Sequence, residues 1–259
     1  MLTYILIGIL VGAITGVTGA SGILVLIPIF TAFFDIPLPV VLGTSLLVDV
    51  IASASVSVSY YLAKHIKIKR SLWIIIGALL GAQIGSYFVV SISRVFIMII
   101  LAVCMIVFGI QMFRNGLSKN HSNLFVPDHI SKYLSTPQGM ILMGLIIGVI
   151  TGIFGAGGGL SVFIILYSVL RFDIKCAVGT SSFVMLLTAI SGVVGYTKMG
   201  NIDFSLGVIM GISAAFGGFF TSVIANRVSE KMLARAIGTF FIFFAVIMVI
   251  VKVLPKLFN

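Results

Sequence analysis

The chain has 259 residues, of which 60% are hydrophobic and only 8% charged, and its mean hydropathy is +1.29. Soluble domains carry roughly 25% charged residues, so the composition excludes an ordinary soluble enzyme or binding domain. Many uncharged stretches of about 20 residues predict an all-α polytopic protein of the cell membrane. The formal net charge of +10 indicates cytoplasmic loops rich in Lys and Arg, and we expect no nucleic-acid partner.

The first apolar stretch, residues 3–34, is interrupted by the sequence TGVTGASG at residues 15–22. As one continuous helix it would be about 46 Å long, whereas the hydrocarbon core of a bilayer is about 30 Å thick. Each glycine also costs about 1 kcal/mol relative to alanine inside a helix. We therefore expect two shorter helices that meet at the glycines.

Three more apolar segments complete a first transmembrane repeat over residues 1–113: about 39–62, 71–92 and 95–113. Residues 114–137 are the only long polar stretch, and we expect them to be a cytoplasmic connector. The same plan then recurs in a second transmembrane repeat over residues 138–259. Its glycine-interrupted stretch and apolar segments are at about 139–170, 176–197, 204–223 and 233–251.

The two halves align without a gap when the sequence is shifted by 136 positions. The matched positions are mainly small residues. Gly8, Gly12, Thr15, Gly16, Gly19 and Gly43-Thr44-Ser45 fall on Gly144, Gly148, Thr151, Gly152, Gly155 and Gly179-Thr180-Ser181. One register kept over about 80 positions is hard to obtain by chance, so the sequence predicts an internal duplication.

The basic residues favour halves of opposite orientation. If each glycine-interrupted stretch is a hairpin that returns to its starting side, the halves are inverted. If the Lys64–Arg70 loop is placed on the cytoplasmic side, twelve of the 16 Lys and Arg residues, those of the loop included, then face the cytoplasm. If each stretch crosses once, the halves are parallel. Ten basic residues then face the cytoplasm and six face the outside. The positive-inside rule therefore predicts two inverted repeats, each a glycine-broken helical hairpin plus three transmembrane helices.

The sequence GASG at residues 19–22 raises the question of a serine nucleophile at Ser21. An intramembrane serine protease needs a base, usually histidine, within hydrogen-bond reach of the hydroxyl. The chain has three histidines, all in polar loops: His65, His121 and His129. The second copy also has Gly157 where the first has Ser21. We therefore expect no enzyme, no cofactor and no metal site.

Both copies share a glycine cluster, Gly19–Gly22 in the first and Gly155–Gly159 in the second. In hydrocarbon an unpaired N–H costs several kcal/mol, so a broken helix persists only where it is buried or lines a polar cavity. The helix N-terminus after a break offers free N–H groups and the positive end of a dipole, which bind anions. We expect the two breaks to face each other near the membrane midplane. The earlier glycines, such as Gly8 and Gly144, are interpreted as helix-packing positions.

Each Gly-Thr-Ser triplet begins 24 residues after a cluster glycine, near the start of the next segment. Its hydroxyls either cap that helix or donate hydrogen bonds to an anion. The residues expected to bind the substrate are Thr18, Gly19, Ser21, Gly22, Thr44, Ser45, Gly155, Gly157, Gly158, Gly159, Thr180, Ser181 and Ser182.

Asp49 is the only acidic residue well inside an apolar segment, and its counterpart in the second half is Met185. Intramembrane carboxylates commonly relay protons, so we expect Asp49 to couple transport to protons. A structural hydrogen bond to the serine-rich run Ser53–Ser59 is the alternative.

These motifs resemble those of the TauE/SafE sulfite exporter family, also described as the toluene-sulfonate uptake permease group. The resemblance rests on two copies of G-x3-G-x3-G-x2-G leading into a glycine cluster, each followed at a fixed distance by Gly-Thr-Ser, and it covers nearly the whole chain. The chain departs from the family's glycine-then-proline pattern at Ala20-Ser21 in the first copy and at Ile164 in the second.

The resemblance implies a secondary transporter, with export as the expected direction, of a small sulfur-containing anion such as sulfite or an organosulfonate. Protons are the expected coupling ion and the lipid bilayer the expected surroundings. Two alternatives remain open. One is a permease for another small anion such as a carboxylate, and the other is an intramembrane hydrolase, for which the sequence offers no base.

Overall fold

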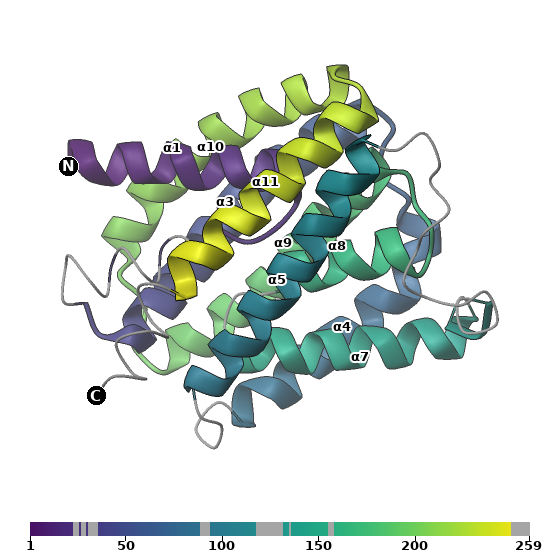
Figure 1. Ribbon diagram of the computed structural model, residues 1–259. Coiled ribbons are helices and arrows are strands. Elements are labelled where there is room, and N and C mark those ends of the chain that lie inside the picture. Colours follow the sequence, from purple (N-terminus) through teal and green to yellow (C-terminus); the bar gives the residue numbers. More distant parts are fainter. Residues whose placement is uncertain are drawn as a thin grey trace.

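A computed structural model describes residues 1–22, 26, 30, 36–88, 94–117, 132–134, 136–154 and 158–249. Its regular elements within these ranges are all helices, as the composition predicts (Figure 1). They are α1 (Leu2–Thr18), α3 (Leu38–Leu62), α4 (Ile68–Phe88), α5 (Arg94–Leu117), α7 (Pro137–Phe154), α8 (Gly158–Ser168), α9 (Ile174–Lys198), α10 (Phe204–Arg227) and α11 (Glu230–Met248).

The helix bounds repeat with the offset found in the sequence. Helices α3, α4 and α5 begin at residues 38, 68 and 94, and α9, α10 and α11 begin 136 residues later at 174, 204 and 230. The loops repeat as well. Lys64 and its counterpart Gly200 both adopt a left-handed backbone, with φ of 60° and 68°. The duplication therefore extends from the sequence to the fold.

Glycines bring helices of the two repeats into close contact. Gly12 of α1 lies against the backbone of Ala214 in α10, and its counterpart Gly148 of α7 lies against the backbone of Ala78 in α4. A β-carbon at either glycine would collide with the facing carbonyl. The interpretation of the early glycines as packing positions is confirmed at these residues, because small residues let helix backbones approach closely.

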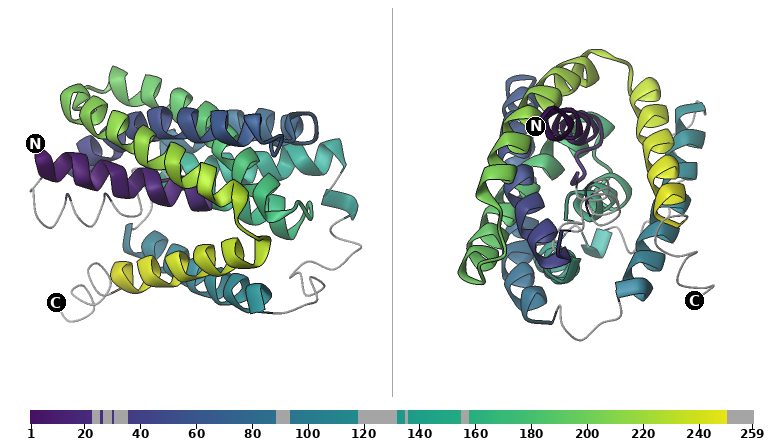
Figure 2. Two further views of the ribbon diagram at one scale, coloured as in Figure 1. Left: turned by 90° about the horizontal axis from the view of Figure 1, so that it is seen from above. Right: turned by 90° about the vertical axis from the view of Figure 1, so that its left-hand side faces the viewer.

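Counterpart helices from the two repeats pack antiparallel. Gly192 of α9 lies against Leu46 near the start of α3, whereas Gly179, earlier in α9, lies against Tyr60 near the end of α3. The counterpart helices α5 and α11 also pack together, through Gly109 and Gly238. They form a pair on one flank of the molecule (Figure 2).

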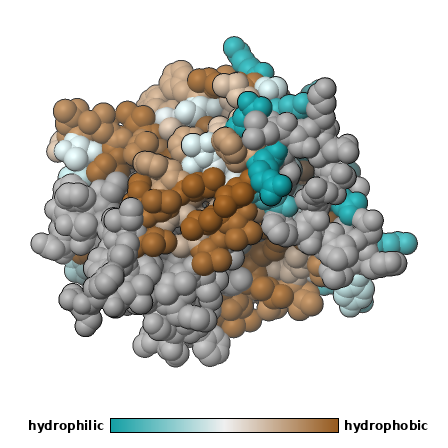
Figure 3. All heavy atoms as spheres, in the orientation of Figure 1, coloured by the Kyte–Doolittle hydropathy of each residue, from teal (hydrophilic) through white to brown (hydrophobic). Residues whose placement is uncertain are grey.

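Large apolar side chains cover much of the outer surface. Along α10, Phe216, Phe220 and Ile224 are 62%, 65% and 60% exposed. Hydrophobic atoms occupy the middle of the face in Figure 3, and hydrophilic atoms gather toward one end. Within the described residues, Pro39–Leu62, Ile174–Lys198 and Phe204–Arg227 are long and apolar enough to cross a membrane. An apolar belt of this kind is stable when it faces lipid chains.

Candidate functional site

The first glycine cluster ends a helix, as predicted. Helix α1 stops at Thr18, and Gly19 takes the left-handed conformation with φ of 65°, which glycine adopts without a steric cost. The Gly19 N–H donates to the Thr15 carbonyl at 2.8 Å. Helical hydrogen bonding resumes after the cluster, because the Leu26 N–H donates to the Gly22 carbonyl at 3.1 Å. Residues Gly19–Gly22 are therefore a true break.

The start of α8, at the end of the second glycine cluster, lies against the first break. Helix α7 ends at Phe154 and α8 begins at Gly158, while Gly155 and Gly157 lie outside the described residues. A β-carbon at Gly159 would lie 2.5 Å from the Gly19 carbonyl oxygen and 3.0 Å from Cα of Ala20. The start of α8 therefore packs directly on the backbone where α1 ends, and a side chain on Gly159 would force α8 away from that backbone.

Asp49 bonds to the first break from the neighbouring helix α3. Its carboxylate accepts hydrogen bonds from the Ser21 hydroxyl and, at 3.3 Å, from the Gly22 N–H. The side chain is buried, with 1% of its surface exposed. Hydrogen bonds of this kind offset part of the cost of burying a carboxylate. The Ser53 hydroxyl, by contrast, donates to the main-chain carbonyl of Asp49. The partners of this carboxylate are therefore in the break rather than in the serine-rich run.

The Gly-Thr-Ser triplet of the second repeat also reaches the first break. The Ser181 hydroxyl lies 3.3 Å from the Gly19 carbonyl and 3.0 Å from the Val178 carbonyl of its own helix. The hydroxyls of Ser45 and Ser182 donate within their own helices, to Leu42 and Val178. Among these three hydroxyls, that of Ser181 is the one that joins the repeats.

The two threonines of the triplets make matching contacts between repeats. The Thr44 hydroxyl accepts a hydrogen bond from the Asp203 N–H at 3.0 Å, and the Thr180 hydroxyl accepts one from the Lys67 N–H at 3.1 Å. Asp203 and Lys67 are also counterparts, 136 residues apart. The alternative that the triplets cap their helices is wrong, because α3 and α9 begin six residues before each threonine (38 to 44, 174 to 180), after Pro37 and Asp173.

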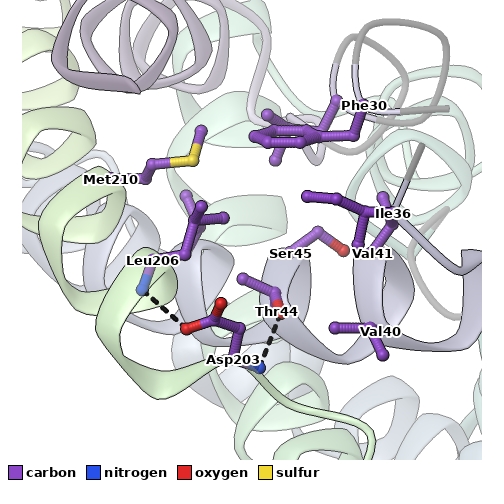
Figure 4. A pocket seen from close by; sticks show the side chains of 11 residues that line it. Phe30, Ile36, Val40, Val41, Thr44, Ser45, Asp203, Leu206 and Met210 are labelled. Carbon is purple, nitrogen blue, oxygen red and sulfur yellow. Dashed lines mark hydrogen bonds between the residues drawn. The ribbon is translucent and has the colours of Figure 1, made fainter. Parts of the chain in front are cut away.

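A small pocket lies beside the first triplet (Figure 4). Its polar lining residues are Thr44, Ser45 and Asp203, and the others are apolar: Leu26, Phe30, Ile36, Val40, Val41, Val48, Leu206 and Met210. The Asp203 carboxylate accepts from the Leu206 N–H at 2.9 Å and so caps α10. The pocket is thus lined by α3, by α10 and by residues that follow the first break.

The sequence does not single out Asp203 or Tyr60, both of which contact predicted elements of the site. The Tyr60 hydroxyl donates to the Gly16 carbonyl at 3.1 Å in the last turn of α1. The alignment of the two halves offers one weak signal for each residue. Asp203 occupies the counterpart position of Lys67, and Tyr60 aligns with Tyr196.

The described residues contain no group of three or more His, Cys, Asp or Glu side chains arranged to hold a metal.

Comparisons with known proteins identify the family. The profile of the sulfite exporter TauE/SafE family matches residues 4–248, which include both breaks and both triplets. The chain belongs to the TauE/SafE sulfite exporter family. No solved structure matches it.

Relatives of this TauE/SafE protein come from bacteria and archaea. It is 28% identical over 239 residues to the probable membrane transporter protein YdhB of Bacillus subtilis, covering 90% of this chain and 94% of the relative. It is 28% identical over 257 residues to the probable membrane transporter protein MJ0441 of Methanocaldococcus jannaschii, covering 92% and 93%. The aligned regions therefore include both repeats. The protein is a multi-pass membrane transporter of the plasma membrane and not an enzyme.

Proposed function

We propose that this TauE/SafE protein is a secondary transporter that exports a small sulfur-containing anion, such as sulfite or an organosulfonate. The observation that carries the proposal is the contact between the start of α8 and the first break, with Gly159 against Gly19 and Ala20. Backbone N–H groups at such breaks replace the water around an anion without a charged side chain. The family match supports the sulfur chemistry.

Alternating access is the second part of the proposal. The repeats make reciprocal contacts, as the pairs Thr44–Asp203 and Thr180–Lys67 illustrate. With α3 and α9 across the bilayer, their antiparallel packing gives the repeats opposite orientations. Inverted repeats of this kind alternate access by rocking one part of the fold against another around a central site. Each of the two contacts then lies at one entrance to the path of the anion.

Proton coupling through Asp49 is the third part. The carboxylate is buried and lies at the first break, so a change in its protonation alters the charge next to the bound anion. We expect Asp49→Asn to abolish proton-driven flux while anion binding is retained. Sulfite flux into proteoliposomes, measured with and without a pH gradient, tests this. Flux that keeps its dependence on the gradient in the variant rules out Asp49 as the coupling residue.

A ligand screen tests the substrate class. The purified protein in detergent is heated with sulfite, sulfate, thiosulfate, alkyl sulfonates and carboxylates, each at the same ionic strength. A ligand that binds only the folded state at about 100 times its Kd adds about 2.7 kcal/mol of stability, which raises the melting temperature. We expect selective stabilisation by a sulfur-containing anion. Equal melting temperatures across the panel would contradict the proposal.

A carboxylate is the second candidate substrate, because the first break already holds the carboxylate of Asp49. The same donors suit a free carboxylate of similar size. Acetate and a sulfonate of matched length, such as methanesulfonate, are therefore the most informative pair in the screen. Stabilisation by acetate alone would favour this second function.

A further inference from the structure

The loops at the two entrances differ in charge although they are counterparts in the fold. Residues 63–70, which follow α3, contain four basic residues and no acidic one. The counterpart residues 199–206, which follow α9, contain Asp203 and no basic residue. The formal charges of the two loops are therefore +4 and −1. Where each loop bonds to the opposing triplet, one repeat has Lys67 and the other has Asp203.

The positive loop lies close to the first break. Its Lys67 N–H donates to the Thr180 hydroxyl at 3.1 Å, and the hydroxyl of the next residue of α9, Ser181, lies 3.3 Å from the Gly19 carbonyl. Two successive residues of α9 therefore connect this loop to the break. The charges of the loop act on an anion that approaches the break from this side.

A lysine of α9 adds to the positive charge at this entrance. The Lys175 ammonium donates to the Asn226 carbonyl at 2.9 Å, and Oδ1 of Asn226 lies 2.7 Å from Nδ1 of His65 in the positive loop. Asn226 thus holds Lys175 beside the loop. Two carboxylates of the same region, Asp173 and Glu230, offset part of the charge. Five basic residues against these two acidic ones leave a net charge of +3.

The negative charge of the other loop borders the pocket beside the first triplet. The Asp203 carboxylate lines this pocket together with Thr44 and Ser45 (Figure 4). Its bond to the Leu206 N–H leaves it ionic, and no cationic side chain in the described part of the chain is bonded to it. An anion that enters from this side meets a charge of the same sign, which repels it.

We propose that the cytoplasmic entrance recruits small oxyanions electrostatically through Lys67 and Lys175, and that Asp203 makes the outer entrance repel them. This inference rests on the proposed function and assigns different properties to the two entrances. Charges around an opening raise the local concentration of ions of opposite sign, and salt screens this effect. Each entrance therefore changes the concentration at which transport from its own side is half-saturated.

The first test removes a charge at the cytoplasmic entrance. Lys67→Gln keeps the bond to Thr180, because the main-chain N–H makes it. Sulfite uptake is measured in everted membrane vesicles, whose cytoplasmic side faces the medium, at about 20 mM and about 500 mM salt. We expect the half-saturating sulfite concentration to rise about two- to threefold at low salt and to stay unchanged at high salt.

Lys132→Gln is the matched control, because it removes the same charge from the connector on the same side of the membrane. It should leave the half-saturating concentration unchanged. Equal effects of Lys67→Gln and Lys132→Gln would mean that the surface charge acts as a whole, and this overturns the inference. The absence of any effect of Lys67→Gln at low salt overturns it as well.

The second test removes the charge at the outer entrance. Asp203→Asn retains an acceptor oxygen for the Leu206 N–H, so α10 keeps its cap. In right-side-out vesicles we expect the half-saturating sulfite concentration to fall about two- to threefold at low salt. Asp173→Asn makes the same chemical change before α9, on the cytoplasmic side, and should not alter uptake from the outer side. Equal effects of the two variants in right-side-out vesicles, or no effect of Asp203→Asn, overturn the inference.

The outcomes separate this inference from the proposed function. Melting temperature and size-exclusion profile establish that each variant is folded. Saturable sulfite flux that neither Lys67→Gln nor Asp203→Asn alters removes the roles of the entrances but leaves the transporter. Failure of the wild type to carry any anion of the panel in either kind of vesicle removes both. Opposite shifts in the two variants, each seen from its own side and lost at high salt, support the inference.

Discussion

Ser181 connects the second repeat to the first break through one hydroxyl. Removing it in Ser181→Ala leaves the Gly19 carbonyl without its 3.3 Å contact to this side chain. A buried hydrogen bond contributes about 0.5–1.5 kcal/mol. We therefore expect the melting temperature to fall by about 2–4 °C. Sulfite affinity should also weaken about threefold, because the backbone at the break is less firmly held.

Thr188→Val is the control for Ser181→Ala. Thr188 lies in the same helix and is buried, but its hydroxyl contacts only carbonyls of that helix, Val184 and Met185, both at 3.1 Å. A loss of stability without a loss of affinity is expected there. If Thr188→Val weakens sulfite binding as much as Ser181→Ala does, the contact between repeats has no special role.

The sequence identifies the residue types of the candidate site but not how they pair. Glycine content and spacing predict the break at Gly19, because a cluster of glycines is a poor helix interior. The bond between Ser21 and Asp49 joins the break after α1 to helix α3, and it depends on how α3 is rotated against the break. Local sequence contains no information on that rotation. The serine-rich run nearby was therefore an equally reasonable partner.

At the level of elements, glycine contacts set the distance between helices of the two repeats. In Gly12→Ala the new methyl group would collide with the Ala214 carbonyl. Backbone atoms of a packed helix cannot yield locally, so α1 must move away from α10. We expect a loss of about 1–3 kcal/mol, seen as a lower melting temperature. The variant should also show reduced flux in proteoliposomes.

Gly195→Ala is the matched control, since no atom lies within 4 Å of an added β-carbon at that position in α9. Alanine favours helix over glycine by about 1 kcal/mol, so this variant should be as stable as the wild type or more so. Equal destabilisation of both variants would show that close packing does not explain Gly12.

Helix bounds are predictable where apolar length sets them and less so where polar residues continue the helix. The predicted segment 39–62 matches α3 (Leu38–Leu62) closely. Helix α5 runs to Leu117, beyond the predicted end at 113, because helical hydrogen bonding need not stop where hydropathy falls. Helix α11 begins at Glu230 rather than 233, because the Ser229 hydroxyl accepts from the Met232 N–H and caps it.

At the scale of the whole molecule, the repeats form one structure by exchanging contacts. Helix α1 packs on α10 of the other repeat and α7 packs on α4. Neither repeat therefore buries its glycine-lined helix by itself. The sequence reveals the duplication, because matching residues keep one register. The packing of helices of one repeat on helices of the other follows only from the three-dimensional structure. An isolated repeat, residues 1–113 or 138–259, should not fold stably, and its co-expression with the other repeat should restore a complex that can be co-purified.

The orientation of the repeats is testable at two counterpart positions, Ala63 and Met199, which are 136 residues apart. They follow the C-terminal ends of α3 and α9, which pack antiparallel, so they lie at opposite ends of the helix pair. Cysteines are placed singly at these positions after Cys104 and Cys176 have been replaced. A membrane-impermeant maleimide added to intact cells should label Met199→Cys and leave Ala63→Cys unlabelled until the membrane is opened. The basic loop that follows Ala63 sets this direction by the positive-inside rule. Labelling of both cysteines from the same side would mean that the repeats are parallel. In that case the two breaks could not have the mirrored arrangement on which alternating access depends.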